Sequence, residues 1–346
     1  MTLTAIIAAY GAYYLGTGTA AEANRTRLFN KVYQPSTTAG YFMLEPTTAT
    51  TWRATKAVLS RVVQGWQKAW TPTTGPTFTP KEFPLYKMKI DIEEIPDDLE
   101  GTYVGFLTRL AMANNENIEN LMRTSWPFVR WFIEEHILGQ QQEDIEMNEI
   151  FWGVYAAPTP GTAAPIATAM NGINKTLNDG LASGAMHTEA TGALATATPS
   201  DFVEQVEDWV ENVLNSTEFK KVRTKPMNVF MRTYNADRYA RGYRDLYGKD
   251  TDQSKLDRTV IDGRPNIRII GLPSMDVKPV AGTASQKIFM TFAENMVRPT
   301  IFGKNQSQVQ TKLANNPRAV QFWSDWWMTA NFVRDEFVAC NELAEV

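Results

Sequence analysis

The chain has 346 residues, with 34 Lys and Arg against 38 Asp and Glu, and a formal net charge of −4 at pH 7. This length suffices for roughly two or three domains that bury their own cores. A single cysteine, Cys340, excludes an internal disulfide framework and a cysteine zinc cluster, and two histidines, His136 and His187, argue against histidine metal chemistry. The balanced charge argues against a dedicated nucleic-acid binder, which needs clustered Lys and Arg, and leaves only weak or local contact.

The N-terminal segment is predicted to be an extended arm. Residues 1–15 (MTLTAIIAAYGAYYL) are apolar, but they lack the basic region of a signal peptide and are too short to span a bilayer. Residues 17–51 are rich in Thr, Ala and Gly, and their apolar side chains follow no sustained period. Because such a segment alone buries too little surface to offset its ordering entropy, we expect it to lie on this chain's core or on a neighbour.

Residues 52–96 predict one long hairpin. Its first limb, residues 52–70, is compatible with strand or helix, and the strand is favoured because a second limb follows. A Pro, Thr and Gly-rich tip at 71–80 leads to EFPLYKMKIDIEEIP (82–96), where apolar and polar residues alternate. A hairpin of this length is marginal by itself, so it should pack against another domain or another subunit.

The following segment changes to helical composition. LTRLAMANNENIENLMR (107–123) predicts one helix or two short ones. A longer helix is predicted to begin at Pro127. Its apolar stripe consists of Trp126, Val129, Ile133, His136 and Ile137.

The central part predicts an α/β layer after an Ala, Thr, Gly and Pro-rich connection at 154–198, which contains a short helix at INKTL. Thr198 is the expected N-cap, and Pro199 the first residue, of an amphipathic helix that ends near Leu214. A buried strand is predicted at 226–232. A second helix, capped by Asn235 and closed by Gly248, and a strand at 266–275 complete the helix, strand, helix, strand order.

The C-terminal part predicts a second sheet. Residues 287–302 read as a strand or a pair of strands, and a polar loop at 303–319 follows. Residues 321–341 read as a long aromatic strand that alternates between Phe332 and Val338. We expect this sheet to receive the helix at 126–138.

This order of parts resembles the major capsid proteins of tailed bacteriophages, the Hong Kong phage capsid fold. The local resemblances are MNGINKTL, DFVEQVEDWVENVL, PMNVFMR with NADRYARGYRDLYG, PNIRIIGLPSM, IFMTFAENMV and FWSDWWMTANFVRDEFVACNEL. They run from about residue 170 to the end, and the N-terminal half agrees in layout only.

The resemblance implies an α+β phage major capsid fold in five parts. These are an N-terminal arm (1–51), an extended hairpin (52–96), a peripheral domain with a long spine helix (97–153), an α/β axial domain (154–275), and a return through the peripheral domain in long C-terminal strands (276–346).

It also implies a structural function without enzymatic activity, cofactor, metal or membrane. Copies would form pentamers and hexamers of an icosahedral shell around double-stranded DNA, giving a virion capsid assembled in the host cytoplasm. Further partners would be separate scaffolding, portal and decoration proteins, with weak non-specific contact to the packaged DNA.

Two alternatives stay open. An encapsulin-like compartment would enclose cargo protein instead of a genome. A soluble α/β enzyme would use a cleft between the central layer and the C-terminal sheet, although the sequence carries no G-x-S-x-G, G-x-x-x-x-G-K-[ST] or complete G-x-G-x-x-G motif.

Some members of the resembled family join subunits by an isopeptide bond between Lys and Asn. Lys68 and Lys81 flank the predicted hairpin tip, and Asn305, Asn315 and Asn316 lie in the polar loop. Both residue types are ordinary in loops, and no partner Glu is apparent. We therefore predict no such cross-link.

Several other candidates receive a structural interpretation. Arg238, Arg241 and Arg244, interleaved with Tyr239 and Tyr243, could meet DNA or phosphate but are interpreted as a solvated helix face paired with Asp237 and Asp245. His136 and His187 are interpreted as a partly buried and a surface histidine, not ligands.

The remaining clusters are interpreted in the same way. The aromatic cluster is assigned to the core or to a subunit interface; it consists of Phe322, Trp323, Trp326 and Trp327. The acidic pairs Glu93–Glu94 and Asp97–Asp98 read as a solvated turn in preference to a cation site at a subunit junction. No catalytic, cofactor-binding or metal-binding residue is therefore predicted.

Overall fold

The computed structural model describes residues 36–59, 62–122, 127–191, 194, 198–247, 260–261, 263–280, 282, 284–301, 310–313, 319–343 and 345. Predictions for the arm up to Pro35, for Trp126, for Gly248 and for the three loop asparagines lie outside these residues. The described chain divides into two compact units. Unit 1 holds the described parts of 88–144 and 304–326, and unit 2 holds those of 36–87, 145–303 and 327–346.

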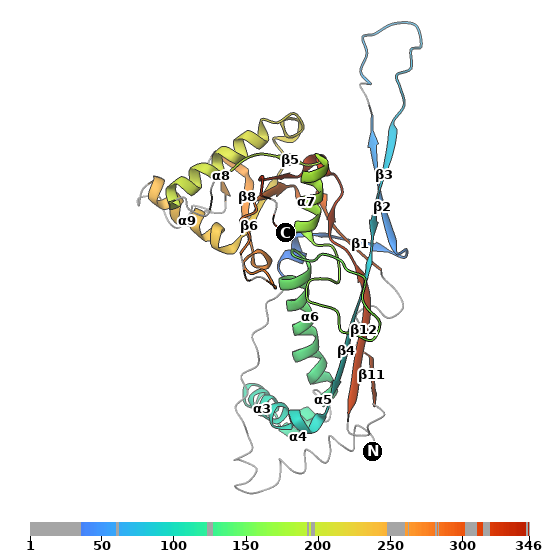
Figure 1. Cartoon of the computed structure of the whole chain (residues 1–346), viewed down its shortest axis with the longest axis vertical. Coiled ribbons are helices and arrows are strands. Elements are labelled where there is room, and N and C mark those ends of the chain that lie inside the picture. The colour runs from blue at the N-terminus through green and yellow to red at the C-terminus, as the bar shows by residue number, and fades with distance from the viewer. Residues whose placement is uncertain are drawn as a thin grey trace. The chain divides into compact units, whose positions relative to one another are not determined.

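Unit 1 combines helices with three strands (Figure 1). Its helical elements are α3 (Pro96–Asn114), α4 (Ile118–Asn120), α5 (Phe128–Trp131), the π-helical segment Phe132–Ile137 and α6 (Leu138–Asp144). Its strands are β4 (Tyr86–Glu94), whose first two residues belong to unit 2, β11 (Gln310–Leu313), and β12 (Val320–Met328), which continues into unit 2. β12 pairs with β4 and runs antiparallel to β11, with Leu313 opposite Val320.

The core of unit 1 joins the long helical stretch to β12. The rings of Phe132 and Phe322 lie 4.9 Å apart between centroids, and Trp131 is fully buried beside them. The prediction that the C-terminal sheet receives this helix is therefore confirmed.

The predicted stripe on this helix was partly wrong. The buried residues are Phe128, Trp131, Phe132 and Ile137, whereas Val129 and Ile133 are only half-buried. Phe128, Trp131 and Phe132 lie at the i, i+3, i+4 spacing of one helical face, whereas the prediction followed Val129 and Ile133 on the adjoining face, which pack only at the margin of this core. The two-helix version of the 107–123 prediction is confirmed by α3 and α4, which are separated at Asn115.

Unit 2 is built on a sheet with strand order β5-β14-β9-β6-β8-β7. The strands are β5 (His187–Thr188), β14 (Ala339–Cys340), β9 (Phe289–Thr291), β6 (Met227–Arg232), β8 (Arg264–Leu272) and β7 (Val260–Ile261). β6 and β8 are parallel, with Met227 opposite Ile267, and helices α8 (Pro199–Leu214) and α9 (Thr233–Tyr247) pack beside them (Figure 1). The predicted α/β layer is confirmed.

Helix α8 forms as its sequence pattern predicts. Its seven periodic apolar side chains are all buried: Phe202, Val203, Val206, Trp209, Val210, Val213 and Leu214. Thr198 Oγ1 accepts from the Asp201 backbone N–H at 3.3 Å, and Asp201 Oδ2 accepts from the Thr198 N–H at 3.4 Å. This reciprocal pair is a capping box, which satisfies N–H groups that have no partner inside the helix.

Helix α9 begins earlier than predicted. It starts at Thr233, directly after β6, so Asn235 lies inside the helix instead of capping it. The Asn235 side chain is fully buried and its Nδ2 lies 3.5 Å from Gln286 Oε1. Asn235 is therefore a polar core residue, which a cap pattern in the sequence cannot distinguish.

A second group of strands in unit 2 surrounds β10 (Met296–Ile301). β1 (Met43–Thr47) runs parallel to β10, with Met43 opposite Val297, and β13 (Asn331–Phe332) and the end of β12 run antiparallel to it. Residues 43–47 were predicted as irregular arm. They form a strand because β10 supplies the backbone partners, although none of the five side chains is buried.

Residues 287–302 form two strands, β9 and β10, separated by the 3-10 turn Ala293–Asn295, which confirms the pair-of-strands alternative. The C-terminal predictions still need three corrections. The two strands lie in different sheets, not in one second sheet. The polar loop contains β11. Residues 321–341 form β12, β13, the 3-10 turn Asp335–Phe337 and β14 in place of one long strand, and the alternation lies in β12.

The hairpin exists, but its limbs differ from the prediction. β2 (Thr51–Val58) pairs antiparallel with β3 (Thr77–Pro84), with Val58 opposite Thr77, and this confirms the strand in the first limb. Most of the predicted second limb, 82–96, is β4, which pairs with β12, and only its first residues belong to β3. Residues 77–80 of β3 were assigned to the tip because of Pro80; a two-stranded ribbon has open edges, where a residue without N–H is tolerated.

The remaining regular elements of unit 2 are short. They are the 3-10 turns Thr38–Tyr41, Phe219–Val222 and Pro273–Met275, the π-helical segment Ile145–Glu149, and α7 (Ile173–Ser183), which extends the short helix predicted at INKTL. None of the helices in the described ranges is long and apolar enough to cross a membrane.

Candidate assembly interface

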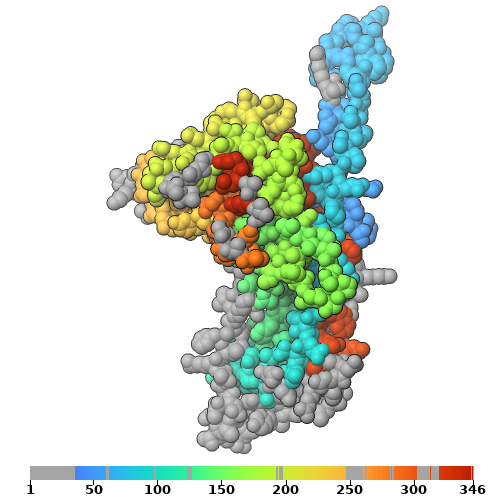
Figure 2. Space-filling model, viewed as in Figure 1, coloured from blue at the N-terminus to red at the C-terminus, as the bar shows by residue number. Residues whose placement is uncertain are grey.

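The tip between β2 and β3 exposes a group of large apolar side chains. Its described residues, 59 and 62–76, have neither helical nor strand structure and are all exposed. Trp66 is 93% exposed and Trp70 92%, values that leave both indoles without cover. In the space-filling view the blue atoms of the tip stand clear of the other atoms of unit 2 (Figure 2).

Hydrogen bonds within the tip hold its two segments together despite this exposure. Gln64 Nε2 donates to the Thr71 carbonyl at 3.0 Å, and Thr71 Oγ1 donates to Gln64 Oε1 at 2.9 Å. These two bonds join the outgoing and returning segments. The tip therefore presents its tryptophans on a closed loop.

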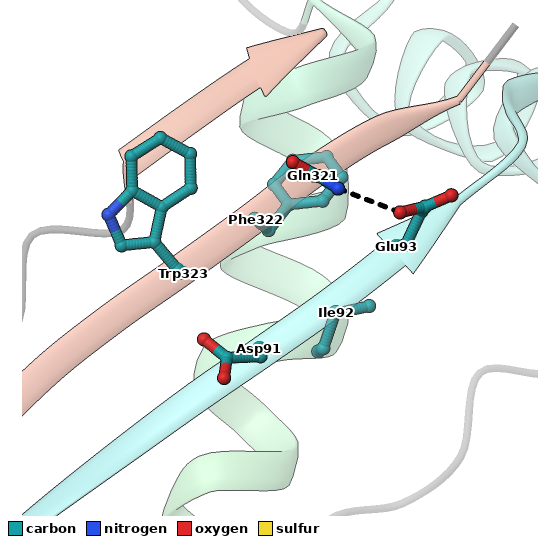
Figure 3. Close-up of a pocket in the computed structure, with 6 residues that line it drawn as sticks. All are labelled: Asp91, Ile92, Glu93, Gln321, Phe322 and Trp323. Carbon is teal, nitrogen blue, oxygen red and sulfur yellow. Dashed lines mark hydrogen bonds between the residues drawn. The ribbon is translucent and has the colours of Figure 1, made fainter. Parts of the chain in front are cut away.

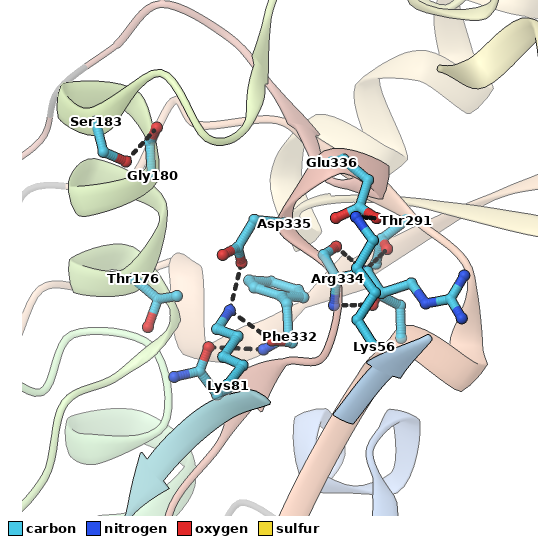
Figure 4. A network of polar contacts seen from close by, with 12 residues as sticks. Lys56, Lys81, Thr176, Gly180, Ser183, Thr291, Phe332, Arg334, Asp335 and Glu336 are labelled. Atoms are coloured by element: carbon cyan, nitrogen blue, oxygen red, sulfur yellow. Dashed lines mark hydrogen bonds and ion pairs between the residues drawn. The ribbon is translucent and has the colours of Figure 1, made fainter. Parts of the chain in front are cut away.

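The other end of the hairpin is fixed to the rest of unit 2 by two ion pairs (Figure 4). Lys56 Nζ lies 2.5 Å from Glu336 Oε1, and Lys81 Nζ lies 2.6 Å from Asp335 Oδ1. Lys81 Nζ also donates to the Phe332 carbonyl at 2.9 Å. Both lysines come from the hairpin strands and both carboxylates from the 3-10 turn before β14, so charge fixes the root of the hairpin.

Apolar contact adds to this anchorage. Phe83 is fully buried, and its ring centroid lies 5.2 Å from that of Trp52 on the opposite strand.

Burial acts to raise the pKa of Glu336, but the hydrogen bond and charge of Lys56, with the charge of Arg334, outweigh it and lower that pKa. Glu336 therefore stays ionised, and the ion pair stays formed, at neutral pH.

The described part of the predicted arm is held by a buried carboxylate. The Thr38 N–H donates to both carboxylate oxygens of Glu146 at 3.0 Å, and the Thr38 hydroxyl donates to Oε1 as well. Thr38 Oγ1 also lies 3.0 Å from Ser274 Oγ. Burial raises the pKa of Glu146, while the bonds from Thr38 oppose that change. No local pattern in the sequence indicates this contact, because Glu146 is one of several acidic residues in a polar helical run.

A buried amine also escaped the sequence interpretation. Lys287 is fully buried, and its Nζ donates to Asn174 Oδ1 at 2.9 Å and to Asn178 Oδ1. Burial lowers the pKa of Lys287 to about 8. The side chains of Asn174 and Asn178 donate in turn to the carbonyl of Glu345, so this group ties α7 to the C-terminal residues.

Unit 1 has a shallow groove of about 360 Å³ between β4 and β12 (Figure 3). Its lining residues are Asp91, Ile92, Glu93, Gln321, Phe322 and Trp323. Gln321 Nε2 donates to Glu93 Oε2 at 2.8 Å across the two strands. No group of three potential metal-ligating side chains occurs within the described part of the chain.

The cross-linking candidates do not come together as a site among the described residues. Lys68 is exposed on the tip, whereas Lys81 lies within β3 and is already paired with Asp335. Asn305, Asn315 and Asn316 lie outside the described residues. The absence of a cross-link stays a prediction.

The interpretation of the arginines was wrong for Arg238. Its side chain is buried, Nη1 donates to the Leu194 carbonyl at 2.7 Å, and the guanidinium lies 4.7 Å from the Phe202 ring centroid. Positions i, i+3 and i+6 drift around a helix, so Arg238 turns toward α8 while Arg241 and Arg244 stay exposed as expected.

The histidines and the aromatic cluster have structural surroundings. His136 is half-buried, its ring lies 4.8 Å from that of Trp131, and burial lowers its pKa. His187 lies in β5 with Nε2 3.6 Å from Glu189 Oε2. In the aromatic cluster, Phe322 and Trp326 are buried and Trp323 and Trp327 half-buried.

The structure describes the side chains of only one of the two acidic pairs, Glu93–Glu94. The Glu93 side chain is exposed and accepts from Gln321, and Glu94 is half-buried. The side chains of Asp97 and Asp98 lie outside the described residues. The cation-site alternative therefore gains no support from the described geometry.

Comparison with known proteins gives a uniform result at the level of structure. No family model and no curated protein matches the sequence. The mature capsid of bacteriophage PhiM1 matches with a TM-score of 0.53 at 8% identity, over 93% of this chain and 91% of that one. The satellite phage P4 procapsid matches with a TM-score of 0.51 at 12% identity, over 88% and 93%.

The chain has the fold of the tailed-phage major capsid proteins. A structure from Gordonia phage Cozz also matches, with a TM-score of 0.52 at 12% identity over 92% of this chain and 90% of that one. This confirms the predicted α+β capsid fold. The SrpI encapsulin from Synechococcus elongatus shares the capsid fold, with a TM-score of 0.50 at 13% identity over 96% and 93%.

Proposed function

We propose that this chain is the major capsid protein of a tailed bacteriophage and that its copies assemble into a closed icosahedral shell around double-stranded DNA. The observation that carries the proposal is a hairpin with a charge-anchored root and an uncovered tryptophan tip, on a chain with the capsid fold. Pentamers and hexamers, assembly in the host cytoplasm, and the division into arm, hairpin, peripheral and axial parts belong to the same proposal.

Association of copies is favoured because it would remove the apolar side chains of the tip from water. A tryptophan buries 150–250 Å² in a core or interface, which corresponds to about 4 to 6 kcal/mol before entropy is subtracted. Unit 2 leaves two such side chains uncovered, Trp66 and Trp70. If each copy contacts the next in the same way and the rotation between them closes a ring, every copy has its tip covered by a neighbour.

The proposal rests on the tip and is tested there. The double substitution Trp66→Ser and Trp70→Ser should abolish particles while leaving the unfolding temperature of the dissociated chain within about 2 °C, because neither side chain contributes to a core. Thr74→Ser on the same tip is the matched control and should assemble normally. Negative-stain microscopy and size-exclusion chromatography supply the readout. Particles formed by the double variant at wild-type concentration would contradict the proposed role of the tip.

An encapsulin-like shell is the second candidate, favoured by the structural similarity to the SrpI encapsulin. The content of purified particles separates the two functions. Particles made in the native host should hold nuclease-protected DNA and absorb strongly at 260 nm if the capsid proposal holds. Particles that enclose only protein would support the compartment.

We propose no enzymatic role, because the structures that the chain resembles are assembled shells. Separate scaffolding, portal and decoration proteins are the partners that a tailed-phage shell would require. Contact with packaged DNA would be weak and non-specific, in line with the net charge of −4.

A further inference from the structure

A surface loop between the long helical stretch and α7 is unusual in its composition. From Ile150 to Asn174 the chain contains no Asp, Glu, Lys or Arg, although these residues make up 21% of the whole sequence. Every residue from Val154 to Ile166 is nevertheless exposed. We call residues 154–166 the neutral loop; its part of the chain appears in green on the visible face of Figure 2.

The neutral loop is held at both ends by specific hydrogen bonds. Val154 N–H donates to the Ala167 carbonyl at 2.9 Å, and Gly172 N–H donates to the Gly153 carbonyl at 2.8 Å. Glu149 Oε2 accepts from the Ala169 N–H at 3.0 Å. The loop therefore begins and ends on a fixed frame.

The backbone of this frame is tightly constrained. Ala167 has φ 62°, a left-handed conformation that costs a non-glycine residue of order 1 kcal/mol or more and persists only where surrounding contacts impose it. A Cβ atom at Gly153 would lie 2.5 Å from the Met170 carbonyl oxygen, and one at Gly172 would lie 2.6 Å from that of Phe151. A surface fixed in this way loses little conformational entropy when a partner binds.

The loop is also continuous with the root of the hairpin. The Tyr155 ring centroid lies 4.7 Å from that of Tyr86, and the Asn171 side chain joins both residues: it accepts from the Tyr155 N–H at 2.9 Å and donates to the Tyr86 hydroxyl at 2.7 Å. Tyr86 begins β4, two residues after β3 ends at Pro84. The neutral loop and the hairpin therefore present adjoining surfaces of one unit.

We propose that the neutral loop is a second docking surface for another copy of this chain, in which Val154, Tyr155 and Ile166 make the apolar contacts. The inference rests on the proposed capsid function and adds a contact beyond the hairpin. The centres of protein interfaces are depleted in charged residues, as this loop is. A nucleic-acid partner is disfavoured because the loop offers no cation to a phosphate.

The test compares two exposed β-branched apolar residues at different locations in unit 2. Ile166 is 58% exposed in the neutral loop, and Val280 is 79% exposed elsewhere in unit 2. Ile166→Asp should raise the concentration needed for half-maximal assembly by about tenfold or more, because an unpaired carboxylate would be buried at the contact. Val280→Asp should stay within about twofold of wild type. Both variants should keep the unfolding temperature of the dissociated chain, because both sites are exposed.

Thiol labelling gives an independent readout. Ile166→Cys should react with a maleimide in dissociated chains and be protected in particles, whereas Val280→Cys should react in both. The native thiol does not interfere, since Cys340 is fully buried and burial raises its pKa to about 11.

The possible outcomes separate this inference from the capsid proposal. Selective loss of assembly in Ile166→Asp, with protection at position 166, supports the neutral loop as a contact. Normal assembly of Ile166→Asp, or equal labelling of position 166 in particles and free chains, overturns the loop inference alone, including the case in which the loop serves a different protein. A wild-type chain that never assembles overturns the capsid proposal and this inference with it.

Discussion

Glu146 and Arg238 show what individual residues contribute. Each is a charged side chain in a buried position, and each has specific partners: Thr38 for the carboxylate, and the Leu194 carbonyl with the Phe202 ring for the guanidinium. Buried charges without such partners would cost several kcal/mol. These two residues therefore fix segments that are distant in sequence.

The titration of Glu146 leads to a prediction. Burial raises its pKa above the ordinary value of 4.5, so the folded chain holds this proton to a higher pH than the unfolded chain does. Its contribution to the free energy of unfolding is therefore complete below the unfolded pKa and is lost as pH rises through the folded pKa. Glu146→Gln cannot titrate, and denaturant unfolding from pH 4 to 7 should show that its stability relative to wild type increases with pH. Parallel curves for the two proteins would contradict the assignment.

At the scale of elements, close packing of α8 against α9 leads to a second prediction. A Cβ atom at Gly242 would lie 2.0 Å from the Pro199 carbonyl oxygen and 2.9 Å from Val203 Cγ2. Gly242→Ala should lower the free energy of unfolding by about 1 to 3 kcal/mol, because overpacking outweighs the better helix propensity of Ala. Gly75→Ala is the control, since a Cβ there meets nothing within 4 Å. Denaturant titration of both variants measures the difference, and an unchanged midpoint for Gly242→Ala would refute the packing argument.

The root of the hairpin leads to a third prediction. A double-mutant cycle with Lys81→Met and Asp335→Asn should show a coupling of about 1 kcal/mol, because this pair is half-buried and also contacts the Phe332 carbonyl. Hydrogen exchange in β2 and β3 should become faster in either single variant. The more exposed Arg53–Glu82 pair across the same strands serves as a reference and should show weaker coupling. Equal coupling in the two pairs would argue against an anchoring role for Lys81.

The helices and strands differ in how well the sequence predicted them. α8 was predicted from cap to last turn, because its N-cap and its 3.6-residue period are local properties. The first half of β3, residues 77–80, was assigned to the tip because Pro80 is typical of turns, yet it is tolerated where the ribbon has open edges. β1 was missed because its backbone partner, β10, lies far away in the chain.

At the scale of the whole molecule, the capsid proposal predicts non-covalent association. Assembled particles run on a denaturing gel without prior cross-linking should give a single band at the monomer mass of 38.9 kDa. The physical reason is that Lys81 is already paired with Asp335 and that no partner Glu accompanies Lys68 in the sequence. A ladder of multiples would overturn this prediction and would point to a lysine outside the pairs described. Substitution of Lys68 by Arg would then show whether Lys68 takes part.

The sequence by itself determined the helices, the central α/β layer, the alternation of β4 and the order of parts that resembles a phage capsid protein, because these depend on local propensity and period. Tertiary structure alone decided which strands pair, where Asn235 and Arg238 point, and that Glu146 holds Thr38. Strand pairing and buried polar contacts join residues tens to hundreds of positions apart, and their free energy depends on partners that no local pattern records. For the same reason the sequence shows that the neutral loop lacks charge, but only the tertiary structure shows that the loop is exposed and held on a fixed frame.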